Sequence, residues 1–153
     1  MPNFNIEQEY SQPVIGIDEV GRGPLAGPVV CCAFIFFNNK INDNELFFID
    51  DSKKLTQKKR TIAIKEIIKL KKKNIIQFSL GMASVDEIDK YNILEATKIS
   101  MCRAVKKLKQ KPTQLIIDGN IDLQLIEYPS RSIIKGDQKS YSIAAASIIA
   151  KIH

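Results

Sequence analysis

A chain of 153 residues is long enough for one domain with a buried core and too short for two domains of ordinary size. Its hydrophobic content of 44% and charged content of 26% are those of an ordinary soluble globular protein. The longest apolar run, Pro28–Phe37, is too short to span a membrane, and the polar segment Met1–Gln12 lacks the apolar core of a signal peptide. We therefore expect a cytoplasmic protein with a single domain over residues 1–153.

The first half of the chain predicts two strands and a basic helix. Val14–Asp18 is short and apolar, as in a buried strand, and Pro28–Phe37 is long and rich in β-branched and aromatic residues. Three glycines and two prolines make the connection between them a shaped loop. Thr56 is a suitable N-cap for a helix that runs to about Lys73. The buried face of this helix is expected to contain Ile64, Ile67 and Ile68.

The second half of the chain alternates helices with strands. Further strands are predicted over Asn74–Met82, Leu115–Asp118 and Ser132–Ile134. Helices are predicted after the capping box at Ser84–Glu87, over Asn92–Lys109 and through Ile143–Ile149. This order favours an α/β fold of three layers, in which a five-stranded mixed sheet is flanked by helices.

Four carboxylates lie where packing alone does not explain them. Asp18 and Glu19 end the first strand, Asp118 ends the fourth, and Asp137 follows the fifth strand just before the last helix. A carboxylate at the tip of a buried strand loses hydration and needs a compensating partner. When several such tips converge, a divalent cation is the usual partner, and oxygen ligands of this kind favour Mg²⁺ or Mn²⁺. The pattern predicts metal-dependent chemistry on phosphate, which needs cations roughly 3.5–4 Å apart.

Alternatives remain open for these acids. Successive strand residues face opposite sides, so Asp18 and Glu19 converge only if the strand breaks between them. Taken singly, each acid also fits an ordinary turn or helix cap. The only histidine is His153, so nuclease mechanisms that need a histidine base lack one elsewhere in the chain. The cysteines have no metal-ligand spacing, and zinc is not expected.

The charge of the chain weakly favours a nucleic-acid partner. The net charge is +6, and if the four carboxylates are set apart, 23 basic residues face 13 acidic ones, a net charge of +10. A basic surface around an acidic site suits a polyanion, although a solvated Lys-rich surface would give the same charge. Lys53 and Lys54 lie in a loop before the basic helix and are predicted to contact backbone phosphates.

The loop after the first strand could approach a ligand closely. Its segment Gly21, Arg22 and Gly23 lets the backbone come near a ligand, and Arg22 could face a phosphate. The spacing differs from that of nucleotide-binding loops, so a nucleotide cofactor is unsupported.

Six short sequence motifs follow one another along the chain. In chain order they are Ile17–Pro28, Asp51–Leu55, Asn92–Leu94, Ile117–Asn120, Lys135–Asp137 and Ser140 with Ile143–Lys151. Together they resemble the motifs of bacterial ribonuclease HII, over nearly the whole chain. The resemblance implies a ribonuclease H-like fold that requires Mn²⁺ or Mg²⁺. It also implies endonucleolytic cleavage of the RNA strand of RNA–DNA hybrids and of single ribonucleotides embedded in duplex DNA, which leaves 5′-phosphate and 3′-hydroxyl ends.

The resemblance also implies roles for particular residues. The family's four active-site carboxylates are matched by Asp18, Glu19, Asp118 and Asp137, of which the first three are the usual metal ligands. The segment whose backbone recognises the ribose 2′-hydroxyl is matched by Gly21, Arg22 and Gly23.

Family members continue past the last helix with an Arg-Asp pair and a C-terminal region, which this chain is expected to lack. One alternative is therefore a hybrid-binding fragment with impaired catalysis. Another nuclease or resolvase of the same fold is a further alternative, but it does not explain the segment after Asp18 and Glu19. We expect the protein to be a monomer.

Overall fold

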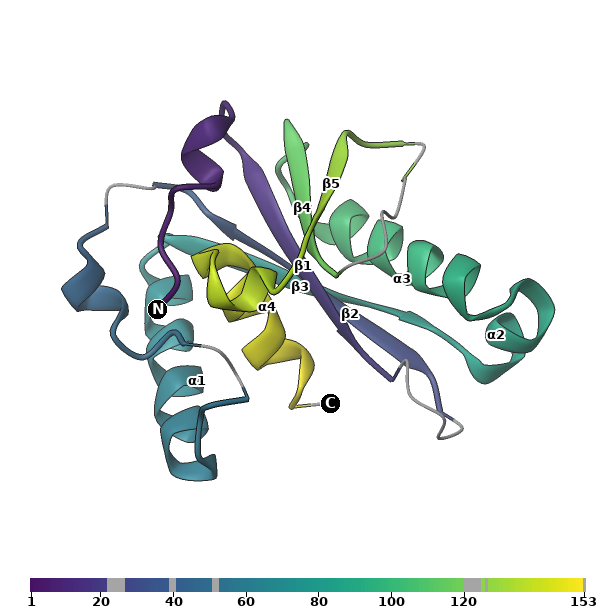
Figure 1. Cartoon of the computed structure of the whole chain (residues 1–153), viewed down its shortest axis with the longest axis horizontal. Coiled ribbons are helices and arrows are strands. Elements are labelled where there is room, and N and C mark those ends of the chain that lie inside the picture. Colours follow the sequence, from purple (N-terminus) through teal and green to yellow (C-terminus); the bar gives the residue numbers. More distant parts are fainter. Residues whose placement is uncertain (22–26, 39–40, 51–52, 120–124, 126, 153) are drawn as a thin grey trace.

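Five strands form one mixed sheet in a computed structural model of the chain, which describes residues 1–21, 27–38, 41–50, 53–119, 125 and 127–152 (Figure 1). The strands are β1 (Val14–Val20), β2 (Val29–Phe36), β3 (Ile76–Ala83), β4 (Gln114–Asp118) and β5 (Ser130–Ile133). Their order across the sheet is β3-β2-β1-β4-β5. β2 runs antiparallel to both β1 and β3, whereas β4 runs parallel to both β1 and β5. The predicted α/β fold with a five-stranded mixed sheet is confirmed.

Helices cover both faces of the sheet (Figure 1). They are α1 (Gln57–Lys72), α2 (Val85–Tyr91), α3 (Ile93–Lys107) and α4 (Tyr141–Ala150). Every residue of β2 is buried, and alternate residues enter different cores. Cys32, Phe34 and Phe36 pack in the core beneath α1 and α4. Cys31, Ala33 and Ile35 pack in the core beneath α3. The apolar run of β2 therefore forms the centre of a three-layer structure.

Side-chain caps fix where three helices begin. The Thr56 hydroxyl accepts the N–H of Lys59 at 3.2 Å, and the Asn92 side chain accepts the N–H of Glu95 at 3.0 Å. Ser84 and Glu87 form the predicted capping box at the start of α2. Each cap satisfies a backbone donor that has no partner inside its helix.

The buried face of α1 differs from the prediction at one position. Ala63, Ile67 and Leu70 are the buried residues of this helix, whereas Ile68 is 42% exposed. Successive helix residues are turned by about 100°, so Ile68 points away from the face that Ile67 buries. The prediction that Ile68 belongs to the buried face of this helix was wrong.

The N-terminal segment packs against the start of α4, a contact that the sequence did not indicate. It contains the 3₁₀ helix η1 (Glu7–Glu9), and Glu7 is only 1% exposed. One Glu7 carboxylate oxygen accepts hydrogen bonds from the Ser140 hydroxyl at 3.0 Å, the Ser142 N–H at 3.0 Å and the Ser142 hydroxyl at 2.8 Å. Burial raises the pKa of Glu7 above its usual range, against the effect of these hydrogen bonds. The described helices include none with the length and apolar character needed to cross a membrane.

Candidate active site

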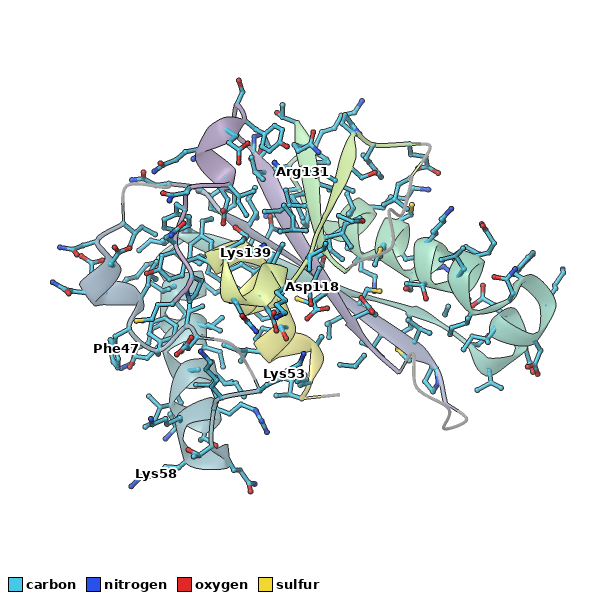
Figure 2. The ribbon with its side chains drawn as sticks, viewed as in Figure 1. Phe47, Lys53, Lys58, Asp118, Arg131 and Lys139 are labelled. Carbon is cyan, nitrogen blue, oxygen red and sulfur yellow. The ribbon has the colours of Figure 1, made fainter. Side chains whose placement is uncertain are left out.

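Asp18 and Asp118 end neighbouring parallel strands on the same face of the sheet. The register of β1 and β4 runs to the pair Ile17–Ile117, and both aspartates follow directly. Asp18 lies opposite Cys32, which belongs to the core beneath α4. Asp118 lies opposite Ile133, which packs with Ile143 of α4. The topology therefore brings these two carboxylates together beside α4, as Figure 2 shows for Asp118.

The environment of Asp18 disfavours its negative charge. Asp18 is only 8% exposed to solvent. Burial, followed by repulsion from Asp118 and Glu19, raises the pKa of Asp18 to about 8. A hydrogen bond from the Ser147 side chain and the N–H of Glu19, 2.8 Å from Asp18 Oδ1, act in the opposite direction. Asp18 is thus a buried acid with two half-buried acids, Asp118 and Glu19, close enough to repel its charge.

The strand break that would let Glu19 converge with Asp18 is absent, because β1 is continuous from Val14 to Val20. β1 continues past Asp18 to Val20, and Glu19 is paired with Cys31, which packs in the core beneath α3. Asp18 and Glu19 therefore leave opposite faces of an unbroken strand. The strand continues because β2 supplies partners as far as Val20. The two carboxylates are still close enough for repulsion from Glu19 to contribute to the raised pKa of Asp18.

Asp137 lies in a turn that is tied to the end of β4. The turn is the 3₁₀ helix η3 (Gly136–Gln138), and the Gly136 N–H donates to Asp118 Oδ1 at 2.8 Å. Asp137 is 3% exposed. Lys135, just before the turn, has a left-handed backbone with φ of 52°. Asp137 therefore directly follows the residue that fixes the Asp118 carboxylate.

A glycine lets α4 lie directly on β1. A Cβ atom at Gly16 would be 2.5 Å from the Ser142 carbonyl carbon and 2.6 Å from the Ile143 nitrogen. Only a residue without a side chain permits this approach. Because α4 lies this close to the strand, Ser147 on the buried face of α4 reaches Asp18.

Gly21, the first of the predicted substrate-binding residues, directly follows the end of β1. Gly21 has φ of +96°, and a Cβ there would meet the Pro28 carbonyl oxygen, so the position requires glycine. Arg22 and Gly23 lie outside the described residues. Lys53 and Lys54 lie before α1 and are exposed (Figure 2).

The donor set of the site suits a hard divalent cation. Among the residues that the structure describes, no group of three or more His, Cys, Asp or Glu side chains is arranged to hold a metal ion. Mg²⁺ is usually bound by one or two carboxylates together with substrate phosphate oxygens and water, so a preformed cage is not needed. Asp18 and Asp118 supply the right ligand type, and their mutual repulsion is what a cation would relieve.

Sequence reasoning missed two residues of this region, Ser147 and Glu7. Both are polar side chains that are 1% exposed, so each needs a polar partner. Ser147 could have been noticed as a hydroxyl in a helix that is apolar on all sides. Glu7 gave no such signal, because it lies in a polar segment and its partners are more than 130 residues away.

A five-stranded mixed sheet with aspartates at the ends of two adjacent parallel strands, covered there by a helix, defines a ribonuclease H-like nuclease. The sequence model of the ribonuclease HII family matches residues 15–153. The chain therefore belongs to the ribonuclease HII family.

Individual relatives agree with this assignment. Ribonuclease HII of Wolbachia sp. subsp. Brugia malayi (strain TRS) is 46% identical over 151 residues, which are 99% of this chain and 70% of that protein. Ribonuclease HII of Orientia tsutsugamushi (strain Ikeda) is 47% identical over 152 residues, or 99% of this chain and 69% of that protein. The crystal structure of ribonuclease H2 from Pyrococcus horikoshii OT3 has a TM-score of 0.71 and 27% identity, with 91% of this chain and 70% of that chain covered.

Family membership determines the reaction class. The chain is a metal-dependent endoribonuclease that cuts the RNA strand of RNA–DNA hybrids, with Mn²⁺ or Mg²⁺ as the cofactor. A hybrid-binding fragment without useful catalysis is not favoured by these relationships. The match to one family also argues against a different nuclease or a resolvase.

Proposed function

We propose that Asp18, Glu19, Asp118 and Asp137 are the active-site carboxylates with which this chain hydrolyses the RNA strand. The observation that supports this most directly is the placement of Asp18 and Asp118 on one face, at the ends of adjacent parallel strands. Carboxylates do not gather at a buried sheet edge without a cationic partner, because burial and mutual repulsion both oppose their charges.

The four carboxylates take different parts in this proposal. Asp18, Glu19 and Asp118 are the metal ligands, and Asp137 is a catalytic carboxylate held beside them by the turn at Gly136. When bound, the metal supplies an activated water and neutralises charge on the scissile phosphate and its leaving oxygen. The protein's own contribution is to orient the acids. The Gly136 N–H fixes Asp118, the Ser147 side chain and the Glu19 N–H fix Asp18, and the packed helix α4 limits the access of water to that side.

Substrate selection is assigned to the residues around the end of β1. The backbone of Gly21, Arg22 and Gly23 recognises the ribose 2′-hydroxyl, which distinguishes RNA from DNA at the cleavage position. Lys53 and Lys54 contact backbone phosphates. With these contacts the enzyme also cuts at a single ribonucleotide embedded in duplex DNA and leaves 5′-phosphate and 3′-hydroxyl ends. It acts as a monomer in the cytoplasm.

Strand cleavage of a DNA duplex with one embedded ribonucleotide tests the proposal. With Mn²⁺ the wild type should cut next to the ribonucleotide and leave an all-DNA duplex intact. Asp18→Asn should abolish cleavage. Asp89→Asn, at an exposed position of α2 on the other face of the sheet, makes the same chemical change away from the site and should cut normally. Full activity of Asp18→Asn would refute the assigned site, and equal cutting of the all-DNA duplex would refute the 2′-hydroxyl role.

A further inference from the structure

Helix α1 has a strong excess of positive charge. Seven of its residues are basic, and Glu66 is its only acid. Among the basic residues are Lys58, Lys65, Lys69 and Lys72, and all four are exposed.

These four lysines form one row along the outside of the helix. Their spacing of 7, 4 and 3 residues keeps them within about 60° of one another, at about 100° per residue. The row lies opposite the buried residues Ala63, Ile67 and Leu70. It extends over about 21 Å at 1.5 Å per residue. We call Lys58, Lys65, Lys69 and Lys72 the lysine stripe.

Ion pairs do not account for most of the stripe. On other elements several basic side chains are paired with acids, as in Lys98–Glu95, Arg103–Glu87, Lys106–Glu127 and Arg131–Glu9. Within the stripe, Lys69 is paired with Glu66 at 3.1 Å. For Lys58, Lys65 and Lys72 no acidic partner lies within ion-pair distance in the part of the chain that the structure describes. Three of its four charges therefore face solvent without an acidic partner among the described residues.

The stripe belongs to the layer that borders the active site. α1 packs against α4, and both helices cover the same face of the sheet. α4 in turn contributes Ser147 to Asp18. In Figure 2, Lys53 lies between Asp118 and Lys58 in the view shown. The basic residues thus continue from the proposed phosphate contacts at Lys53 and Lys54 onto the first turn of α1.

We propose that the lysine stripe is a second contact surface for the nucleic-acid duplex, where it binds phosphates away from the cleaved bond. This inference rests on the proposed function, because it takes the duplex bound at the carboxylates to be the occupant. A row of solvent-facing lysines suits a regular row of phosphates, and such contacts add affinity without reading base or sugar. Neutralising the stripe should therefore weaken the binding of any duplex and leave the discrimination between ribonucleotide and DNA unchanged.

The test is duplex binding by the full chain as a function of salt. The probes are a DNA duplex of about 20 base pairs with one ribonucleotide and the matching all-DNA duplex, both in EDTA so that no cleavage occurs. The variant is K58Q/K65Q/K69Q/K72Q, in which glutamine keeps a good helix former at each position. We expect Kd at about 50 mM salt to rise at least about tenfold, and the slope of log K against log salt to fall in magnitude by about 3. Both duplexes should be affected by the same factor.

A matched control variant distinguishes the effect of this surface from the effect of lowering the net charge of the protein. K90Q/K106Q/K109Q/K111Q removes the same charge from exposed positions on or near α2 and α3, on the other face of the sheet. It should change Kd by less than about threefold. An unchanged salt slope in the stripe variant, or an equal loss in the control, would overturn the proposal, as would a loss confined to the ribonucleotide duplex. Failure of the proposed function is seen separately, as a wild type that binds duplex but does not cut next to a ribonucleotide with Mn²⁺.

Discussion

The N–H of Gly136 donates a hydrogen bond to the Asp118 carboxylate at 2.8 Å, which joins the end of β4 to the turn that contains Asp137. The same turn leads within three residues into α4, whose Ser147 bonds Asp18. Two of the four acids are therefore oriented by one continuous segment, residues 136–147. Substitutions in this segment should therefore alter metal binding by the acids more than they alter the stability of the fold.

Mn²⁺ should stabilise the folded chain through these acids. A cation that binds only the folded state stabilises it by about 2.7 kcal/mol at a concentration 100 times Kd. Asp118→Asn removes one ligand and one repelling charge, so it should raise the melting temperature in EDTA and shrink the increase caused by Mn²⁺. Thermal unfolding across a millimolar Mn²⁺ series measures both effects. Asp89→Asn should keep the wild-type response, and an Mn²⁺ response that survives in Asp118→Asn would exclude Asp118 as a ligand.

Ser147→Ala should weaken metal binding by its effect on Asp18. The Ser147 side chain bonds the Asp18 carboxylate, and the loss of a residue that orients a ligand typically costs about 10- to 100-fold in metal affinity or activity. Calorimetric titration with Mn²⁺ gives Kd independently of cleavage, and the cleavage assay should show a parallel loss.

Ser100→Ala is the matched control for this change. Its hydroxyl is also buried, donates to the Thr97 carbonyl at 2.7 Å and lies 2.7 Å from Cys31 Sγ, but it lies on α3, beneath the other face of the sheet. Both variants should lose about 1 kcal/mol of stability for the missing hydrogen bond. Equal Mn²⁺ affinities in the two variants would show that Ser147 has only a structural role.

Local sequence signals predicted the sheet and the pair of aspartates well. The caps at Thr56, Ser84 and Asn92 involve contacts within three residues, so their side-chain chemistry is visible in the sequence. Asp18 and Asp118 could be placed together because parallel neighbouring strands end at the same edge of a sheet.

Long-range contacts explain what the sequence did not show. β1 extends past Asp18 because β2 pairs with it as far as Val20, and no residue near Glu19 indicates this. The burial of Glu7 depends on Ser140 and Ser142, whose positions are known only once the chain has folded. Ile68 shows the limit of counting apolar residues, because the helix turns it away from the face that Ile67 buries.

Gly16→Ala should destabilise the protein and impair the site. Its new Cβ would lie 2.5 Å from the Ser142 backbone, so α4 must move away from β1. Overpacking of this kind typically costs about 1–3 kcal/mol. Urea unfolding measures the free energy of unfolding, and Mn²⁺ titration shows whether the shift of α4 disturbs Asp18. Gly27→Ala is the control, since its Cβ would meet no atom of the described residues within 4 Å. Equal stability of the two variants would mean that α4 does not lie as close to β1 as described.

The buried carboxyl of Glu7 should make the stability of the protein depend on pH. Burial raises the pKa of Glu7 in the folded chain above its unfolded value of 4.5. The folded state therefore binds this proton more tightly than the unfolded state. The resulting contribution to stability is complete below about pH 4.5 and is lost as the pH rises through the folded pKa.

Glu7→Gln should reveal how much Glu7 contributes to the pH dependence of stability. The substitution removes the titrating group, while the amide oxygen can still accept hydrogen bonds from Ser142. The melting temperature of Glu7→Gln minus that of the wild type should increase from about pH 4 to about pH 8, since only the wild type loses the contribution of Glu7 over that range. All groups that titrate in both proteins cancel in this difference. Glu9→Gln, in the same 3₁₀ helix but exposed, controls for the loss of one negative charge and should not show the same increase. A difference that stays constant with pH would mean that Glu7 is not held in a desolvated position against α4.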